Sequence, residues 1–459
     1  MPPRVEHLVV LMLENRSFDH MLGFLKSPEH PIDGLTGTET NPSADHGPDV
    51  RVSREAQAAG DLNPDPGHEF EDVNVQLFGT REPLAGQTPT MQGFVRSYAT
   101  TDGTQRHGTS IMKCFAPSRL PVLSTLAAQY AVCDRWFSSV PGPTIPNRMF
   151  AHAGTSLNRV VSDPDLRKLH TIFEAIDTDP AFRAIDYRIY SHDGFTLLLT
   201  VNHLIDDQHG FRDYNRFAHD CAHGNLPAYT FIEPRYANDA RGGDFFAAND
   251  QHPDHDVVEG ERLIRDVYHA IRSNAKLWHS TLLLIVYDEH GGIFDHVPPP
   301  DIPATGDPSI DSTFAFDRLG LRVPAVLVSP YIAPRTVISH TYEHASIVST
   351  IRHLFGLTAL TLGRDATAAP CDFSTVPHLD APRTDVVSFP TLHAATPPVG
   401  DTRASELARL MVRQMHATLQ RLDLPTPIEP HRVVTDQHAS DFMRTAARMI
   451  SDGGTVAPA

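Results

Sequence analysis

The sequence predicts an α/β protein, a three-layer α/β/α sandwich with helices on both faces of a mainly parallel central sheet. Short runs of apolar residues recur along the chain and have the composition of strands that are buried on both faces. Segments with helical periodicity separate these runs, as the connections between parallel strands require. Acidic residues directly follow two of the runs, at the edge of the sheet where open α/β folds build their sites.

Five strands are expected from the apolar runs and four helices from the segments between them. The first strand, 7–13, is almost continuous in leucine, valine and methionine, and the strand 281–287 is rich in leucine, isoleucine and valine. The helix 259–274 places Leu263, Val267 and Ile271 on one face, because residues four apart share a face. The helix 405–422 is amphipathic. The other expected elements are the strands 187–190, 228–232 and 323–329 and the helices 121–130 and 342–355.

The chain is expected to form one catalytic domain and a shorter extension. Its 459 residues suffice for one large domain, and no internal repeat divides them. Its 38 prolines predict much ordered loop, including a polar surface excursion at 36–66 and a surface or linker segment at 365–402. We expect a catalytic domain over 1–390 and a mostly helical extension over 391–459, of which 451–459 should fray.

Composition limits the binding partners and the cellular compartment that we expect. A net charge of −18 disfavours a nucleic-acid partner, which needs a basic surface. No apolar run approaches the length of a membrane span, and the N-terminal run is too short for a secretory signal. We therefore expect a cytoplasmic protein, unless a leader has been removed. Cys133 is expected to be buried, the pairing of the four cysteines (114, 133, 221 and 371) stays open, and their spacing does not predict a zinc knuckle.

Two polar clusters follow predicted strands and could hold a divalent cation. Glu14 and Asn15 follow the first strand, and Asp288 and Glu289 follow the strand 281–287. Carboxylate and amide oxygens suit a hard or borderline cation. The competing interpretation is helix capping, for which Asn15, Ser17 and Asp288 are all suitable. The occurrence of two clusters, with a pair of glycines after the second, favours the metal.

A proline-rich turn holds a hydroxyl group that could act as a nucleophile. Thr144 lies between Pro143 and Pro146, and Asn147 and Arg148 follow it. A hydroxyl near a divalent cation ionises more easily and can attack phosphorus. Asn147 and Arg148 are candidates for substrate binding, although Arg148 could instead hold the turn. The competing interpretation is a loop in which Thr144 caps a helix starting near residue 147. A sulfatase is disfavoured because threonine cannot be converted to formylglycine.

Histidines beside turns provide candidates for proton transfer. His68 and His252 each lie next to a Pro or Gly turn, and His290 immediately precedes the glycine pair. Such turns fix a side chain in place, although a single histidine is more often a surface residue. His68 and His252 are candidate catalytic residues, and His290 is a candidate substrate-binding residue.

Five ordered blocks resemble the phosphoesterase family of bacterial and plant nonspecific phospholipases C, which also contains a bacterial acid phosphatase. The blocks are 14–20, 65–68, 144–148, 250–253 and 288–292, the last followed by 295–299. The resemblance extends from residue 7 to about residue 355 and implies the alkaline-phosphatase-like fold. By position, Thr144 matches the nucleophile, and His68 and His252 match histidines near the phosphoryl group. The residues that match metal ligands are Glu14, Asn15, Thr144, Asp288 and Glu289.

The resemblance implies a metal-dependent phospholipase C. Such an enzyme hydrolyses a glycerophospholipid such as phosphatidylcholine to diacylglycerol and a phosphorylated head group, here through a phospho-threonine intermediate. The alternatives are an acid phosphatase that acts on small phosphomonoesters, and an α/β binding domain without activity. Ca, Zn, Mn and Mg all remain candidates for one or more divalent ions. The expected partner is a phospholipid or phosphate ester, and peripheral membrane contact is compatible with this interpretation.

Overall fold

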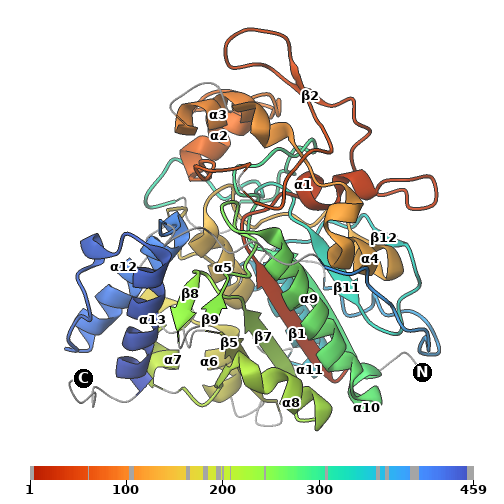
Figure 1. Ribbon diagram of the computed structural model, residues 1–459, viewed down its shortest axis with the longest axis vertical. Coiled ribbons are helices and arrows are strands. Elements are labelled where there is room, and N and C mark those ends of the chain that lie inside the picture. Colours follow the sequence, from red (N-terminus) through yellow and green to blue (C-terminus); the bar gives the residue numbers. More distant parts are fainter. Residues whose placement is uncertain are drawn as a thin grey trace.

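An eight-stranded sheet forms the centre of the protein in the computed structural model (Figure 1). The structure describes residues 5–451, except 60, 103–107, 162–165, 179–184, 193–197, 199–200, 207, 242–243, 305–308, 358–361, 367–371 and 393–402. The strand order is β12-β4-β11-β10-β1-β7-β5-β6. These strands are β1 (His7–Leu13), β4 (Ala131–Cys133), β5 (Tyr187–Ser191), β6 (Phe211–Asp213), β7 (Tyr229–Glu233), β10 (Thr281–Tyr287), β11 (Ala325–Val328) and β12 (Thr336–Ile338).

Strand β1 is central because it is apolar enough to be buried on both faces. Residues Leu8 to Leu13 are fully buried, and β1 pairs in parallel with β10 on one side and β7 on the other. Its register places Leu8 opposite both Leu282 and Tyr229. The five predicted strands are all present, and the mainly parallel sheet is confirmed.

Strand β11 departs from the parallel expectation. It pairs antiparallel with β10 and with β4, whereas the other seven strands share one direction. A parallel neighbour would need a crossover that carries the chain back to the opposite edge of the sheet. The described residues between β10 and β11 contain no helix, so the chain re-enters the sheet from the edge at which it left.

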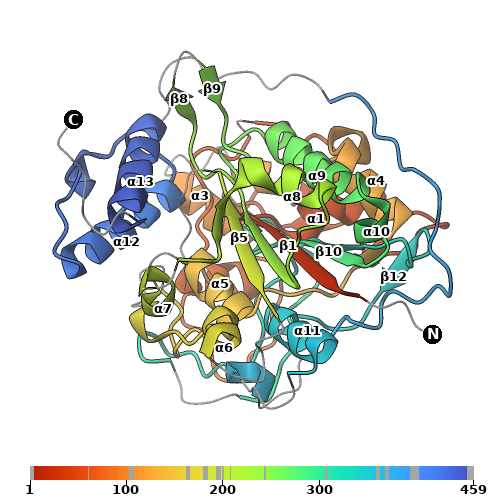
Figure 2. The ribbon, with the colours of Figure 1, turned by 90° about the horizontal axis from the view of Figure 1, so that it is seen from below.

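Helices cover both faces of the sheet, as the predicted sandwich requires (Figure 2). Side chains alternate between the two layers: Phe173 of α6 stacks on Tyr229 of β7, whereas Phe217 of α8 meets Tyr190 of β5. One layer contains α4 (Pro121–Gln129), α8 (Phe217–Ala222), α9 (Val257–Arg272) and α10 (Ala275–Trp278). The other contains α5 (Thr144–Ala153), α6 (Ile172–Thr178), α7 (Asn202–Asp206) and α11 (Ala345–Phe355).

A smaller apolar cluster lies apart from the main core. The predicted excursion 36–66 contains a short hairpin, and the helices α2 and α3 follow it above the sheet (Figure 1). Val73, Leu77 and Phe94 of these helices pack with Ile293 from the loop after β10. The helices α2 and α3 therefore hold the 64–68 loop near the carboxyl ends of the strands. The elements are α1 (Phe18–Leu22), β2 (Thr40–Asn41), β3 (Val50–Arg51), α2 (Phe70–Phe78) and α3 (Phe94–Asp102).

Two C-terminal helices, α12 (Glu406–Arg421) and α13 (Asp436–Ser451), pack on each other and on the hairpin of β8 (Asp239–Arg241) and β9 (Asp244–Phe246). Arg444 forms an ion pair with Asp239, and Asn238 Nδ2 donates to Oδ2 of Asp436 at 2.7 Å. Helix α12 confirms the helix expected at 405–422, while the domain boundary near residue 390 stays a prediction. The segment 372–392 has neither helix nor strand, and 393–402, 452–459 and Cys371 lie outside the described residues.

No helix in the described ranges has both the length and the apolar character needed to cross a membrane. Cys133 is fully buried, as expected, and Cys114 and Cys221 are also buried free thiols.

Candidate active site

The carboxyl ends of three neighbouring strands bring acidic side chains together. Strand β1 leads into Glu14 and Asn15, β10 leads into Asp288 and Glu289, and β7 ends at Glu233. Because β10, β1 and β7 are adjacent, these residues meet at one edge of the sheet. The backbone N–H of Asn15 donates to Oδ1 of Asp288 at 2.9 Å, and this contact joins the two predicted clusters.

Two glycines allow the loops at this edge to approach closely. Gly291 and Gly292 have φ angles of +64° and +68°, which side chains rarely adopt. A Cβ atom on Gly291 would lie 2.1 Å from the carbonyl oxygen of Asn15, and one on Gly292 would lie 2.4 Å from that of Gly67. The glycine pair therefore holds the loop after β10 against the loop after β1 and against the segment that carries His68.

Thr144 is the first residue of α5, and its side chain faces the end of β1. Its Oγ1 donates to Oδ1 of Asn15 at 3.2 Å, and the residue is 2% exposed. The N-terminus of α5 places positive partial charge at this hydroxyl. The helix-capping interpretation does not hold for Thr144, because Pro143 occupies the N-cap position and no side chain caps α5. Among the residues considered as caps, Ser17 does cap a helix, accepting from the N–H of His20.

Arg148 links the carboxylates that the strands bring together. Its guanidinium pairs with Glu14, lies 2.8 Å from Oε2 of Glu233, and lies 3.6 Å from Oδ2 of Asp288. The residue is 2% exposed, and these carboxylates raise its pKa against the opposing effect of burial. Arg148 therefore lies in the interior of the site among these carboxylates, and its role in substrate binding stays a prediction.

Asn147 supports the proline turn with its side-chain amide. Its Nδ2 donates to the carbonyl oxygens of Gly142 and Pro143, both at 3.0 Å, and its Oδ1 accepts from the N–H of Val140 at 3.0 Å. It is also fully buried. The amide of Asn147 thus bonds the backbone that positions Thr144, and its role in substrate binding stays a prediction.

His290 also has both ring nitrogens engaged. Nε2 lies 2.8 Å from Oε1 of Gln76, and Nδ1 lies 3.2 Å from Oε2 of Glu289. The imidazole thus connects α2 to Glu289 and orients that carboxylate. Its contacts support the site, and its role in substrate binding stays a prediction.

The predicted ligand residues fit a divalent cation by their unsatisfied oxygens. Oε2 of Glu14, Oδ2 of Asp288 and Oε1 of Glu289 are buried without a hydrogen-bond partner. Burial raises the pKa of Glu14; Arg148 opposes this shift, and the carboxylate of Asp288 adds to it. Buried carboxylate oxygens without partners are costly, and a bound cation would compensate them.

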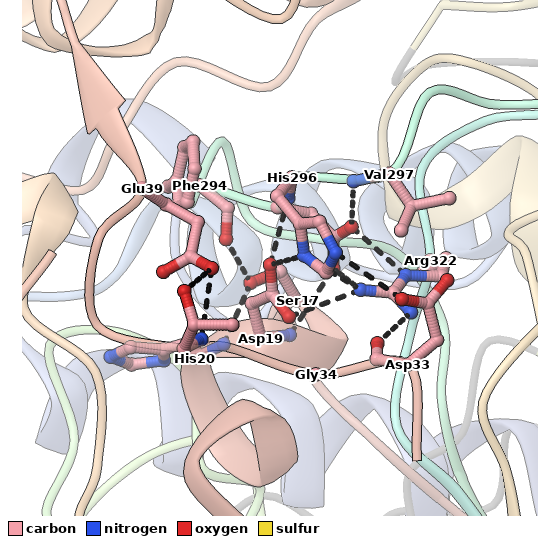
Figure 3. A network of polar contacts seen from close by, with 12 residues as sticks. Ser17, Asp19, His20, Asp33, Gly34, Glu39, Phe294, His296, Val297 and Arg322 are labelled. Atoms are coloured by element: carbon pink, nitrogen blue, oxygen red, sulfur yellow. Dashed lines mark hydrogen bonds and ion pairs between the residues drawn. The ribbon is translucent and has the colours of Figure 1, made fainter. Parts of the chain in front are cut away.

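A second acidic group contains Asp19, Asp295 and His296, whose ligand-type atoms lie within 4.8 Å of one another. The carboxylates of Glu14, Asp288 and Glu289 are not gathered so tightly. Figure 3 shows that Arg322 lies among the second group: its Nε donates to Asp295 at 2.9 Å and its Nη2 to Asp19 at 3.0 Å.

Every carboxylate oxygen of this second group accepts a hydrogen bond. Oδ2 of Asp19 accepts from both the N–H and Nδ1 of His296, and Oδ2 of Asp295 accepts from the N–H of Asp19. The group therefore has the composition of a metal site, but Arg322 already supplies the positive charge. We regard the unsatisfied oxygens of Glu14, Asp288 and Glu289 as the better fit for a cation.

His68 and His252 meet at the carboxylate of Asp65. Oδ2 of Asp65 lies 3.9 Å from Nδ1 of His68 and 3.4 Å from Nε2 of His252. Burial opposes the charge of His68, but the carboxylates of Glu289 and Asp65 outweigh it and raise its pKa to about 10. For His252, burial is outweighed by Asp65 and Asp254, which raise its pKa to about 9. Both imidazoles thus favour the charged form.

Several residues of this site were not predicted. Glu233 is the last residue of β7 and directly follows the predicted strand 228–232, so the rule applied to the two polar clusters could have found it. Asp65 begins the block 65–68, in which a role was predicted only for His68. No sequence motif around Arg322 indicated a role for it, because its partners come from distant parts of the chain.

The fold and the site define a hydrolase of phosphoric esters. The model of the Phosphoesterase family matches residues 5–358, and the chain belongs to this family. The predicted resemblance and the enzyme class are thus confirmed.

Similar proteins carry phospholipase names. Non-specific phospholipase C6 of Arabidopsis thaliana is 40% identical over 430 residues, covering 88% of this chain and 78% of the relative. Non-specific phospholipase C3 of the same plant is 37% identical, over 85% of this chain and 77% of the relative. Phospholipase C B of Mycobacterium tuberculosis is 27% identical, over 83% and 81%.

Solved structures give a much weaker likeness. A 2-O GAG sulfatase matches with a TM-score of 0.33 and 11% identity, over 56% of this chain and 68% of the other. The phosphonate monoester hydrolase of Silicibacter pomeroyi matches with a TM-score of 0.27 and 13% identity, over 58% and 73%. These values carry no argument about the activity of this chain.

Proposed function

We propose that the protein is a phospholipase C-type phosphodiesterase, which converts a glycerophospholipid and water into diacylglycerol and a phosphorylated head group. The observation that carries the proposal is the hydroxyl of Thr144, held at the start of α5 beside Asn15 and the buried carboxylates. Five plant relatives at 35–40% identity are named non-specific phospholipases C, which supports a lipid diester as the substrate.

In the proposed reaction, Oγ1 of Thr144 loses its proton to solvent and attacks phosphorus, and the bond from phosphorus to the glycerol oxygen breaks. The positive end of α5 favours the developing negative charge, and His68 faces it as a cation. His252, also charged, donates its proton to the leaving diacylglycerol oxygen. Water then cleaves the phospho-threonine and releases the phosphorylated head group.

The residues that would hold a divalent cation are Glu14, Asn15, Thr144, Asp288 and Glu289. When bound, such an ion favours the ionised hydroxyl and offsets the charge of the phosphoryl group. Elemental analysis of purified Glu14→Ala and Asp288→Ala variants tests this assignment: both should lose the ion, whereas the control Asp266→Ala, a half-exposed position on α9, should keep it. Retention of a stoichiometric ion by either variant would remove that residue from the ligand set.

The test of the function follows the products formed from phosphatidylcholine vesicles by the wild type and by the Thr144→Ala and Thr144→Ser variants. We expect diacylglycerol and phosphocholine from the wild type, a loss of about three or more orders of magnitude in Thr144→Ala, and substantial retention in Thr144→Ser. Release of inorganic phosphate from soluble monoesters, without diacylglycerol from the vesicles, would support the acid phosphatase alternative instead. Normal activity of Thr144→Ala would overturn the nucleophile.

A further inference from the structure

The loop 249–256, which enters α9, contains two buried histidines and several acids, of which Asp250 is buried and Asp254 is partly exposed. His252 and Asp250 are fully buried, and His255 is 5% exposed. Arg16 anchors the loop, because its Nε donates to the carbonyl of Gln251 at 2.6 Å and its Nη2 to that of His252 at 3.1 Å. The end of β1 thus fixes the backbone of His252.

The side chains of the loop form an alternating series of carboxylates and imidazoles. Nδ1 of His255 lies 2.7 Å from Oδ1 of Asp250, and its Nε2 lies 3.7 Å from Oδ1 of Asp254. The same oxygen of Asp254 lies 2.7 Å from Nδ1 of His252. Asp254 is therefore placed between two imidazoles, and His255 between two carboxylates.

We infer that Asp254 and His255 are positioning residues for His252, which they hold with its Nε2 hydrogen directed into the site. This inference rests on the proposed function, in which His252 donates a proton. Because a carboxylate only accepts, Nδ1 of His252 must carry the hydrogen that bonds Asp254. Nε2 then bears the second proton of the charged ring and lies 3.4 Å from Asp65. This arrangement follows the general pattern in which a carboxylate fixes the tautomer of a functional histidine.

His255 contributes by keeping Asp254 ionised. Burial alone would raise the pKa of Asp254, but His255 and His252 outweigh it and lower that pKa. For His255, burial is outweighed by Asp250, Asp254 and Asp436, which raise its pKa to about 10. Since Asp436 begins α13, the C-terminal helices contribute a charge to this series.

The first test does not depend on activity. NMR titration of histidine-labelled protein gives the pKa of His252, whose signal is identified by its loss in His252→Ala. The Asp254→Asn variant should lower this pKa by at least about one unit, and His255→Gln should lower it less. The matched control is Asp256→Asn in the same loop, since Asp256 caps α9 and asparagine also caps. An unchanged pKa in Asp254→Asn would overturn the inference.

The second test compares substrates. In His255→Gln, cleavage of phosphatidylcholine should fall by about tenfold or more, while p-nitrophenyl phosphorylcholine, whose leaving group needs no proton, should be affected much less. The loss should disappear in a His252→Ala background, because the two residues act through one group. Equal losses on both substrates, or an undiminished loss in that background, would reduce the pair to a structural role and overturn the inference.

The tests also separate this inference from the proposed function. If the wild type does not cleave phospholipids while Asp254→Asn still shifts the pKa of His252, the proposed substrate is wrong and the positioning stands. If Asp254→Asn does not fold, His255→Gln carries both measurements, because it leaves the bond between Asp254 and His252 in place.

Discussion

Replacing Gly291 by alanine should displace the loop that holds Asn15. The new Cβ would lie 2.1 Å from the carbonyl oxygen of Asn15, where contacts below 3.0 Å are essentially never seen, so one loop must move by about 1 Å. The positive φ of +64° adds about 1–2 kcal/mol of backbone strain. Because Asn15 accepts the hydrogen bond of Thr144, a shift of this size should reduce kcat by about a hundredfold.

The matched control is Gly356→Ala, at the end of α11. Gly356 has a φ of +70°, but an added Cβ would meet no atom within 4 Å, so this variant has the same strain without the collision. Gly291→Ala should lose more thermal stability than Gly356→Ala, measured by calorimetry, because it adds the collision to the same strain, and only Gly291→Ala should lose hydrolysis of p-nitrophenyl phosphorylcholine. Equal activity in the two variants would refute the view that the close contact positions Asn15.

Three further results are expected. The kcat/KM for phosphatidylcholine should fall as pH rises above about 9, because His252 has a raised pKa of about 9 and loses its donated proton there; a flat profile to pH 10 would argue against this acid. Arg322→Met should destabilise the protein by about 3–5 kcal/mol in urea unfolding, because two buried carboxylates lose their cation. Glu261→Ala should cost about 1–3 kcal/mol in the same assay, since Glu261 accepts from the N–H groups of Val122 and Leu123 at the start of α4.

The apolar runs predicted the strands well because strands buried on both faces leave few other interpretations. The strand 281–287 was predicted to the residue, and 7–13 likewise. The direction of β11 was missed because direction depends on the connection and not on composition. Helix α13 lies within the extension predicted to be mostly helical, but its bounds were not predicted, although Phe442, Met443 and Ala446 show the spacing of an amphipathic helix.

The positions of site residues that directly follow strands were predictable. The contacts that depend on the direction of a side chain were not. Glu14 and Asp288 were placed correctly at one edge, because strand ends converge there. The sequence could not show that the amide of Asn147 faces its own backbone, or that Arg148 faces carboxylates. Acids flank His255 in the sequence, but the sequence could not show which of them its ring nitrogens contact.

The central position of β1 has a consequence for synthesis of the protein. Leu8 is made more than 200 residues before Tyr229, its nearest pairing partner along the chain. At about 5–20 residues per second, the ribosome needs about 10–45 s to reach that partner. For this time the apolar segment His7–Leu13 must be kept from aggregating by transient contacts or by chaperones. The strand at the centre of the finished sheet is thus a segment of the growing chain that is prone to aggregate.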